Sequence, residues 1–468
     1  EFRLCSSDLV VFADQWRGTA VGFRDEQVLT PNIDKFTETS FYTEEAVTGC
    51  PLCSPYRGEL LTGRHTASTG IFGNCMTGYT FALSEDEICI SDILKKEGYR
   101  TGYIGKWHLD MPERNFCVNP LSGAEDWDAY TPPGKKRHGF DYWYAYNASN
   151  DHLHQHYWHN TVEKIYASEW SPIHETGKAI DFIEKSSNGP FALFLSWNPP
   201  HPPFSKVPKE YSSLYKEGEI RFRQNVQGTR FDNQTGELGI ENEKKLREAA
   251  CQYFGAVSGL DEQFGRLLDY LQKKDLLDNT IILLTADHGE HLGSHGYVGK
   301  HTWFEESIGV PFILRYPSKV PKGKNNIFIQ TVDIFPTLFG IMGLSTPDTV
   351  QGIDLSKYIK NGVKPDQNRA FSSAYISRDI FLEAYKKAGK ELQKSGWRCI
   401  KTPEYKYVIE KGYMPDCQVR YWLYDRENDP YEMHPVMAVN FEQDKIMKKL
   451  HEQLCGYLEE IGDMIYLT

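Results

Sequence analysis

The sequence predicts an α/β fold: a large, mainly parallel sheet sandwiched by helices, plus a smaller C-terminal α+β subdomain with a short antiparallel sheet. Short apolar runs rich in β-branched and aromatic residues alternate with segments of helical period, as in sheets whose crossovers are helices. Past Lys360 the pattern changes to shorter strands. A chain of 468 residues is long enough for both parts. We therefore expect domains at residues 1–365 and 366–468.

The first domain should alternate buried strands with helices. Its predicted strands are Leu9–Ala13, Thr101–Ile104, Phe191–Trp197, Ile281–Thr285 and Pro311–Tyr316. Ser91–Glu97 is expected to be a helix because Ser91 can cap it and Gly98 can end it. The other predicted helices are Ile33–Thr39, a segment starting at Cys53, Glu241–Lys274 with a break near Gly255–Gly259, and Val332–Met342.

The second domain should be a small antiparallel sheet with a covering helix. Its predicted strands are Trp397–Thr402, Tyr405–Ile409 and Tyr421–Tyr424, and its predicted helix is Phe441–Ile461. The segment Ser212–Asn242 is charged and irregular, so we expect it to be an excursion from the sheet.

Polar residues follow directly after several predicted strands. Asp14 follows the first strand, His201 lies just beyond Phe191–Trp197, and Asp287-His288 follows Ile281–Thr285. In open α/β sheets, ligands bind beyond the carboxyl ends of the strands. The sequence therefore predicts that these side chains meet in one crevice.

Composition and charge argue against some classes of partner. Hydrophobic residues make up 40% of the chain and charged residues 25%, as in an ordinary globular enzyme. The formal net charge of −12 argues against nucleic acid and against a membrane surface. No apolar run approaches the ~20 residues of a membrane span, and the chain opens without a signal-peptide pattern. An anionic substrate would need a local positive pocket.

The cysteines are too dispersed to predict a disulfide framework or a zinc site. Cys50 and Cys53 form a Cys-x-x-Cys pair, which leaves a redox or metal function open, but no second pair completes a zinc site. The ten positions are Cys5, Cys50, Cys53, Cys75, Cys89, Cys117, Cys251, Cys399, Cys417 and Cys455.

One of these cysteines lies in a far more specific context. Residues 53–64 read Cys-Ser-Pro-Tyr-Arg-Gly-Glu-Leu-Leu-Thr-Gly-Arg. Pro55 has no N–H donor and therefore fits the first turn of a helix. Cys53 would then lie at the positive end of that helix, with Arg57 one turn further along the same face.

This dodecamer resembles the sulfatase signature, in which the cysteine is oxidised to formylglycine. Further motifs of the formylglycine-dependent (type I) sulfatases follow in the family's order over nearly the whole chain. They are Thr30–Asp34, Gly105–His108, Pro200–Pro202, Asp287–Gly289, Gly299-Lys300, Asp333–Thr337, Leu423–Asp425 and Asn428–Pro430. The chain is identified as a member of this family, in the alkaline phosphatase-like superfamily, and it is similar to carbohydrate sulfatases of the bacterial type.

The resemblance implies a sulfuric ester hydrolase that works by covalent catalysis. In the family, the hydrated aldehyde attacks sulfur, the alcohol leaves, and sulfate is then expelled as the aldehyde forms again. The matching positions are Cys53 as nucleophile precursor, Arg57 as its contact, Lys106 and Lys300 as sulfate-binding groups, His108 as the base of the second step, and His201 as the acid for the leaving oxygen.

The resemblance also implies one divalent cation, with Ca²⁺ as the first choice. Its ligands by position are Asp14, Gln15, Asp287 and His288, together with residue 53. Many relatives carry Asp where this chain has Gln15, and Asn where it has His288. Both departures remove anionic or oxygen ligation, which is expected to weaken a site for a hard cation.

The substrate is expected to be a small sulfated saccharide that is attacked from its non-reducing end. The acidic surface disfavours long polyanions, and the segments Phe140–His159 and Ser212–Asn242 are expected to wall the crevice into a pocket. Aromatic and histidine residues in the first of these segments suit sugar binding, with His152 the favoured contact. By resemblance, galactose and N-acetylgalactosamine sulfates are the expected sugars.

Two other functions stay open. A phosphonate or phosphate ester hydrolase of the same superfamily would also use formylglycine, although Lys106, His108 and Lys300 favour a sulfatase. A non-catalytic sugar-binding relative would keep an unmodified cysteine. For the sulfatase, the resemblance implies maturation by formylglycine-generating machinery and a periplasmic, cell-surface or secreted location.

Overall fold

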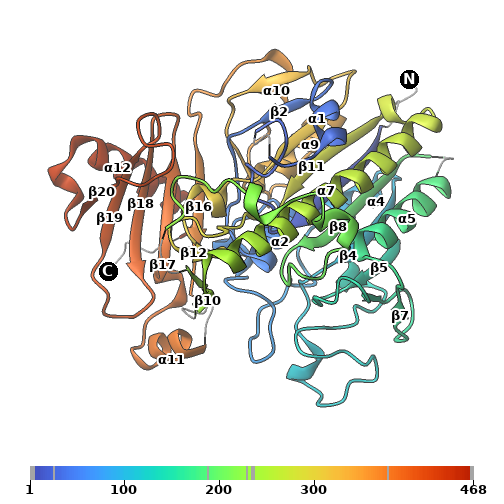
Figure 1. Cartoon of the computed structure of the whole chain (residues 1–468), viewed down its shortest axis with the longest axis horizontal. Coiled ribbons are helices and arrows are strands. Elements are labelled where there is room, and N and C mark those ends of the chain that lie inside the picture. Colours follow the sequence, from blue (N-terminus) through green and yellow to red (C-terminus); the bar gives the residue numbers. More distant parts are fainter. Residues whose placement is uncertain are drawn as a thin grey trace.

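The structure is a computed structural model that describes residues 6–24, 27–186, 189–227, 230–232, 238–376 and 379–463. Its largest sheet consists of β1 (Ser7–Asp14), β2 (Phe41–Thr43), β4 (Arg100–Lys106), β5 (Tyr142–Tyr146), β8 (Phe191–Pro200), β11 (Thr280–Ala286), β13 (Phe312–Arg315) and β14 (Gly323–Asn325). The strand order is β14-β2-β13-β11-β1-β8-β4-β5 (Figure 1). Strands β11, β1, β8, β4 and β5 are parallel, whereas β13 runs antiparallel to β11 and β2. The predicted large, mainly parallel sheet is confirmed.

The strands and helices of this part follow from burial. Every residue of β1, β8 and β11 is buried, which explains their continuous apolar runs. The flanking helices include α1 (Pro31–Thr37), α2 (Cys53–Thr62), α4 (Ile90–Lys96), α5 (Ser171–Glu184), α7 (Glu243–Lys273) and α9 (Thr331–Met342). Helix α7 packs on α5 and α1, and α2 packs on α9 and α4.

The predicted break in the long helix is wrong, because α7 runs without interruption from Glu243 to Lys273. The glycines in its middle are places of close contact. A Cβ atom on Gly255 would lie 2.7 Å from the Cα of Ser212, and one on Gly259 would lie 2.7 Å from the ring of Trp170. These positions need glycine for packing, at a modest cost in helix propensity.

The C-terminal part is an antiparallel sheet with one covering helix, as predicted. Its strands are β16 (Ala370–Ala374), β17 (Gly396–Lys401), β18 (Tyr405–Gly412), β19 (Arg420–Asp425) and β20 (Val436–Ala438), in that order. Helix α12 (Lys445–Glu460) packs on β17 and β18. It begins later than the predicted Phe441 because Asp444 accepts hydrogen bonds from the N–H groups of Ile446 and Met447.

This second sheet packs directly on the first part of the chain. Trp397, Val408 and Tyr424 of the sheet share a core cluster with Val47 and Ile308. Trp397 Nε1 also donates a hydrogen bond to the carbonyl oxygen of His301 at 3.2 Å. The domain boundary at residues 365/366 stays a prediction, although the C-terminal sheet begins soon after it.

The segment Ser212–Asn242 contains more structure than expected. Its strands β9 (Arg230–Asp232) and β10 (Leu238–Ile240) form a small sheet with β12 (Tyr297–Val298); residues 228–229 and 233–237 lie outside the described part. The remaining elements are β3 (Ala46–Val47), α3 (Thr66–Thr69), β6 (His156–Tyr157), β7 (Ile165–Tyr166), α6 (Lys209–Ser212), α8 (Glu305–Ile308), β15 (Ile329–Gln330), α10 (Ser356–Asn361) and α11 (Asp379–Lys387). Among the described helices, none is both long and apolar enough to cross a bilayer.

Candidate active site

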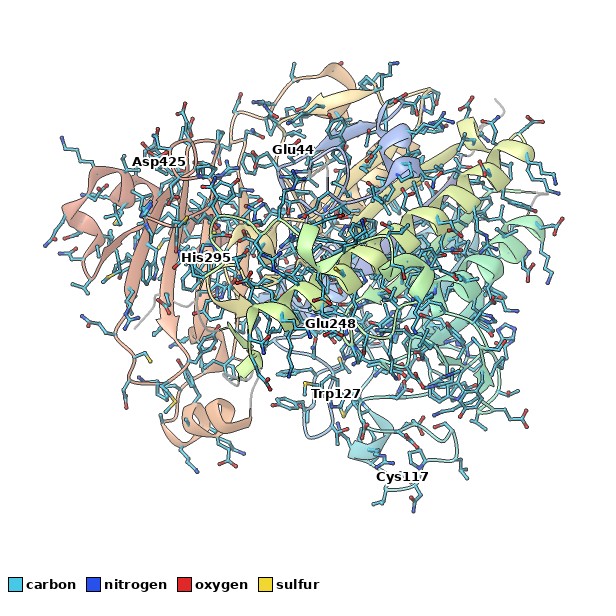
Figure 2. The ribbon with its side chains drawn as sticks, viewed as in Figure 1. Glu44, Cys117, Trp127, Glu248, His295 and Asp425 are labelled. Atoms are coloured by element: carbon cyan, nitrogen blue, oxygen red, sulfur yellow. The ribbon has the colours of Figure 1, made fainter. Side chains whose placement is uncertain are left out.

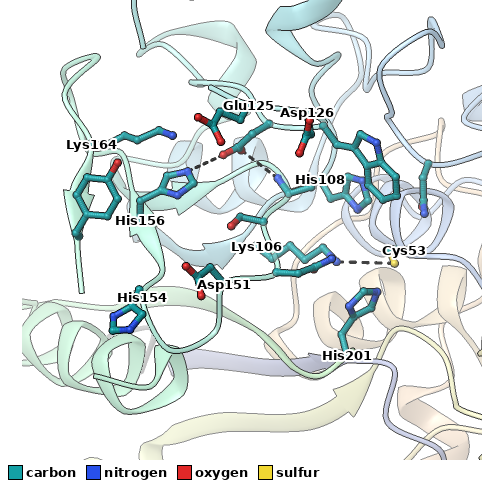
Figure 3. Close-up of a pocket in the computed structure, with 17 residues that line it drawn as sticks. Cys53, Lys106, His108, Glu125, Asp126, Asp151, His154, His156, Lys164 and His201 are labelled. Carbon is teal, nitrogen blue, oxygen red and sulfur yellow. Dashed lines mark hydrogen bonds and ion pairs between the residues drawn. The ribbon is translucent and has the colours of Figure 1, made fainter. Parts of the chain in front are cut away.

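The polar residues predicted at strand ends lie together at the carboxyl edge of the parallel strands. Asp14 ends β1, His201 follows β8 directly, and Asp287-His288 follow β11 directly. Lys106, which the family resemblance gave, ends β4. Cys53 is the first residue of α2, and its Sγ lies 3.5 Å from Asp14 Oδ1, 3.4 Å from His288 Nε2 and 3.9 Å from Lys106 Nζ. Figure 3 shows this sulfur facing Lys106 and His201.

Arg57 ties the carboxylates of the site together. Its Nη2 lies 3.4 Å from Asp14 Oδ2 and 3.6 Å from Asp287 Oδ2. Its Nη1 donates to the Lys106 carbonyl oxygen at 2.5 Å and to Ser196 Oγ at 2.7 Å. The guanidinium is buried, one helical turn after Cys53, and so fixes the start of α2 against the strand ends.

The acceptors around Cys53 fit a divalent cation. Ligand atoms of Asp14, Cys53, Asp287 and His288 all lie within 4.8 Å of one another. The Nδ1 of His288 donates to the Gly289 carbonyl oxygen at 3.1 Å, so its Nε2 carries a lone pair. That Nε2 lies 3.5 Å from Asp14 Oδ1 and 3.5 Å from Asp287 Oδ1. Buried acceptors that converge in this way suit a cation between them.

The ionisation of the two carboxyl groups points the same way. Burial alone would raise the pKa of Asp14, but the charges of Lys106 and Lys300 hold it well below its ordinary range. Burial and the neighbouring Asp14 raise the pKa of Asp287 to about 7. Two carboxylates this close repel each other unless a positive charge joins them; Arg57 supplies one such charge, and a cation at this point would add another.

The same surroundings suppress thiolate chemistry at Cys53. Burial, followed by the charge of Asp14, raises the pKa of the thiol to about 11. An unmodified Cys53 is therefore a protonated thiol at neutral pH, and the thiolate is the reactive form of cysteine. The site does not favour Cys53 as a nucleophile in its own right.

Two buried lysines give the site its positive charge. Lys106 Nζ donates to Asp14 Oδ2 at 2.5 Å and to Asn198 Oδ1 at 3.2 Å. Lys300 Nζ donates to Gln15 Oε1 at 2.6 Å. These groups provide, inside a protein of net charge −12, the local positive pocket that an anionic substrate requires.

The two candidate proton-transfer residues are both held neutral. His108 has a positive φ of 54°, and neither of its ring nitrogens has a hydrogen-bond partner among the described residues. Burial, Lys106 and Arg57 lower its pKa well below the ordinary value. His201 donates from Nδ1 to the Pro202 carbonyl oxygen at 2.7 Å; burial, Lys300 and Lys106 lower its pKa.

His152 is not among the residues that line the cavity, and its side chain is 2% exposed, like that of Lys106. Its role as a sugar contact stays a prediction. Its Nε2 donates to the carbonyl oxygen of His201 at 2.9 Å. His152 therefore supports the backbone of His201, whereas the neighbouring His154 and His156 line the cavity (Figure 3).

The site opens into a cavity of about 530 Å³. Its walls come from residues 125–128 and from residues between 148 and 166, and the described residues of Ser212–Asn242 contribute none of the lining. Asp128 joins these two walls, because it pairs with His156 Nε2 at 2.6 Å and accepts from the Asn147 N–H at 2.9 Å. Trp127 lies toward the edge from which the segment carrying Cys117 projects (Figure 2).

Sequence reasoning missed several residues of this site. Asn198 accepts from Lys106 and donates to the Ser149 carbonyl oxygen at 2.6 Å, which a position at the end of a predicted strand could have indicated. Glu125, Asp126 and Trp127 line the cavity but follow no strand or motif. Only the tertiary structure brings them to the site.

Comparisons with known proteins agree with this geometry. The sulfatase family profile matches residues 9–344, and the C-terminal profile of N-sulphoglucosamine sulphohydrolase matches residues 293–460. An endo-4-O-sulfatase of Bacteroides thetaiotaomicron is 31% identical over 98% of this chain and 92% of its own length. An ulvan-active sulfatase of Formosa agariphila is 31% identical over 97% of this chain and 81% of its own length. The crystal structure of a Bacteroides fragilis protein designated as the sulfatase yidJ superposes with a TM-score of 0.85 at 32% identity, covering 99% of this chain and 98% of that one.

The fold and the site thus define a hydrolase of the alkaline phosphatase-like superfamily. Within it, the chain belongs to the sulfatase family and is a sulfuric ester hydrolase.

Proposed function

We propose that the protein hydrolyses an O-sulfated sugar through a formylglycine formed from Cys53, with one calcium ion at the carboxyl edge of the sheet. A single observation carries this proposal. Cys53 Sγ lies within 3.9 Å of a carboxylate, an unprotonated imidazole nitrogen and an ammonium group at once. A hydrated aldehyde at this point would face metal ligands on one side and a sulfate-binding group on the other.

The cation would be held by Asp14, Gln15, Asp287 and His288, together with the modified residue 53. Bound there, a divalent cation supplies Lewis-acid activation of the nucleophile. The carboxylate and amide oxygens of this set suit Ca²⁺, because Asp14 and Asp287 bring the anionic charge that a hard cation requires, whereas the imidazole of His288 weakens that preference. Arg57 holds both carboxylates in place, one helical turn after the nucleophile position.

Lys106 and Lys300 are proposed to bind the sulfate oxygens. Both side chains are buried, and both lower the pKa of His201, so their charges act on the group proposed to protonate the leaving oxygen. Preorganised cations of this kind stabilise the charge that develops in the transition state.

His108 and His201 are proposed to move protons. His108 is neutral and its ring nitrogens are free of other bonds within the described structure, which suits a base for the second step. His201 must first be protonated to act as the acid. A bound sulfate ester places negative charge beside Lys106 and Lys300, which offsets their effect and raises the pKa of His201.

Mass spectrometry of the peptide that contains residues 50 and 53 tests the nucleophile. Protein from a host with formylglycine-generating machinery should carry an aldehyde at residue 53, with unmodified Cys50 as the internal control in the same peptide. Full activity with an unmodified Cys53 would contradict the proposal.

The substrate is proposed to be the terminal sugar of a small sulfated saccharide, with galactose or N-acetylgalactosamine sulfates as first candidates. The walls at residues 125–128 and 148–166 enclose a cavity of the size of a few sugar rings at most. Relatives named for endo action and for ulvan make an internal sugar the competing outcome. A terminal sulfated monosaccharide, compared with the same unit inside a polymer, decides between them.

Two further comparisons complete the test of function. Sulfate and phosphonate esters assayed side by side separate a sulfatase from the phosphonate hydrolase alternative, and sugar binding without turnover would indicate a non-catalytic relative. We also propose a periplasmic, cell-surface or secreted location, which fractionation of the native host would test.

A further inference from the structure

Gln15 lies between two side chains of opposite charge. Its Nε2 donates to Glu290 Oε2, and its Oε1 accepts from Lys300 Nζ at 2.6 Å. All three side chains are buried. The carboxamide of Gln15 is thus the link between a buried carboxylate and a buried ammonium group at the metal site.

Only one orientation of this amide is chemically consistent. An ionised carboxylate can only accept hydrogen bonds, and an ammonium group can only donate them. The NH₂ of Gln15 must therefore face Glu290, and its oxygen must face Lys300. Amide orientation is otherwise ambiguous, because nitrogen and oxygen have nearly the same shape.

Glu290 is itself held firmly. Its Oε1 accepts from the N–H groups of Leu292 and Gly299, each at 2.8 Å, so both carboxylate oxygens are used. The backbone of Gln15 is fixed as well. It has a positive φ of 68°, its N–H donates to Asp287 Oδ1 at 2.9 Å, and its carbonyl oxygen accepts from Tyr253 at 3.0 Å.

We infer that Glu290 is a positioning residue that turns the Gln15 oxygen, and not its nitrogen, toward the bound cation. Glutamine can present either atom to a metal, whereas the aspartate of many relatives can present only oxygen. Glu290 removes that ambiguity, so Gln15 acts as an oxygen ligand and the site keeps its affinity for a hard cation. This inference rests on the proposed metal site and extends it by one residue that no motif assigned.

A donor–acceptor exchange tests the inference. The dissociation constant of Ca²⁺ is measured by calorimetry on chelator-stripped full-length protein for four chains: wild type, Gln15→Glu, Glu290→Gln, and the double variant. In the double variant, the amide introduced at position 290 can donate to the carboxylate introduced at position 15 and still accept from Leu292 and Gly299. The hydrogen bond is restored with its two ends exchanged.

We expect Glu290→Gln to raise the Ca²⁺ dissociation constant at least about tenfold when residue 15 is glutamine, as for other outer partners of metal ligands. With glutamate at residue 15, Glu290→Gln should raise the Ca²⁺ dissociation constant less than about threefold, or lower it. The loss of one negative charge near the cation occurs in both backgrounds. In the glutamate background it also relieves the repulsion between the facing carboxylates at positions 15 and 290, and the melting temperatures of the chelator-stripped chains report that repulsion separately.

A purely structural Glu290, acting only through Leu292 and Gly299, would give the same factor in both backgrounds, and that result would overturn the inference. A wild-type protein that binds no Ca²⁺ would overturn the metal site itself, so the two failures are distinguishable. The melting temperature of each chelator-stripped chain checks folding. If Glu290→Gln unfolds, Glu290→Asp, which keeps the charge but shortens its reach, replaces it in the glutamine background alone. There it should raise the Ca²⁺ dissociation constant, and an unchanged constant would contradict the inference.

Discussion

The floor and the rim of the cavity are built in different ways. The floor, with Asp14, Lys106, Asp287 and His288, consists of residues at strand ends that are 0–2% exposed and cross-linked by hydrogen bonds. The rim lies on loops and short strands, and it includes Trp127 at 37% exposure and Tyr166 at 67%. Rigid sheet edges hold groups to the tolerance that catalysis needs, whereas loops can change without disturbing the fold.

This difference separates chemistry from recognition. Changes in the floor should abolish turnover of every sulfate ester, whether its alcohol is a sugar or a simple phenol. Changes in the rim should alter which saccharide is accepted and leave small aryl esters unaffected. Paired substitutions of the same residue type in the two regions make the comparison quantitative.

Loss of the cation should have the largest effect. Asp287→Ala, or chelation, removes an interaction worth several kcal/mol, so turnover should fall more than about 10³-fold. The matched control is Asp151→Ala, because Asp151 is a rim carboxylate that pairs with Lys206 at 2.7 Å. Asp151→Ala should lower turnover less than about tenfold. Equal losses in both variants, measured as released sulfate, would contradict the distinction.

His201→Ala should have the next largest effect. Loss of the acid should slow saccharide hydrolysis roughly 10²–10⁴-fold. Activated aryl sulfates, whose alcohol leaves without protonation, should be affected much less. His154→Ala provides the matched control, because His154 lines the same cavity on the exposed rim. A similar loss on both kinds of ester would count against the acid role.

His152 supports the backbone of His201, and its burial predicts that the stability of the protein depends on pH. Burial lowers its pKa in the folded protein to about 4 from an ordinary 6.5. As pH falls below 6.5, the unfolded chain takes up the proton first, so the stability due to the neutral side chain is complete above pH 6.5 and is lost toward pH 4. Between about pH 7 and about pH 5 this loss is about 2 kcal/mol.

Denaturant unfolding of His152→Gln checks this prediction. Glutamine keeps a donor for the His201 carbonyl oxygen but does not titrate, so its unfolding free energy should vary less with pH over this range by about 2 kcal/mol. An unchanged pH dependence would show that the pKa of His152 is the same in the folded and the unfolded protein.

A rim aromatic residue should have the smallest effect. Trp127→Ala should raise KM for a saccharide about tenfold, the loss expected for an aromatic contact, with kcat for an aryl sulfate unchanged. Phe116→Ala is the control, since Phe116 is 75% exposed and does not line the cavity. If both variants behave alike toward saccharides, residue 127 does not contact the sugar.

The difference between the floor and the rim of the cavity also explains how much of the site could be predicted from the sequence. Asp14, Lys106 and Asp287 stand where buried apolar runs end, and the topology of a parallel sheet brings such positions to one edge. Cys53 and Arg57 are predicted from the resemblance of residues 53–64 to the sulfatase signature, and helix geometry predicts only their relative placement. The structure brings all of these residues together, and the predicted fold is confirmed.

The rim was not predictable on these grounds. Residues 125–128 reach the cavity because Asp128 pairs with His156 and accepts a hydrogen bond from the Asn147 N–H. These contacts join segments whose spacing in the sequence does not predict that they meet. His152 is expected to contact sugar from composition alone, and composition does not predict its buried hydrogen bond to the His201 carbonyl oxygen. The glycines of α7 resembled a break because close helix contacts leave the same sequence pattern as a turn.

Sulfate release from a panel of defined sulfated saccharides, with a phosphonate ester assayed alongside, tests the central claim most directly. Wild-type protein carrying the aldehyde and supplied with Ca²⁺ should release sulfate from at least one sulfated galactose or N-acetylgalactosamine, and Cys53→Ala should release none. Faster hydrolysis of the phosphonate ester, or equal sulfate release by Cys53→Ala, would contradict the account.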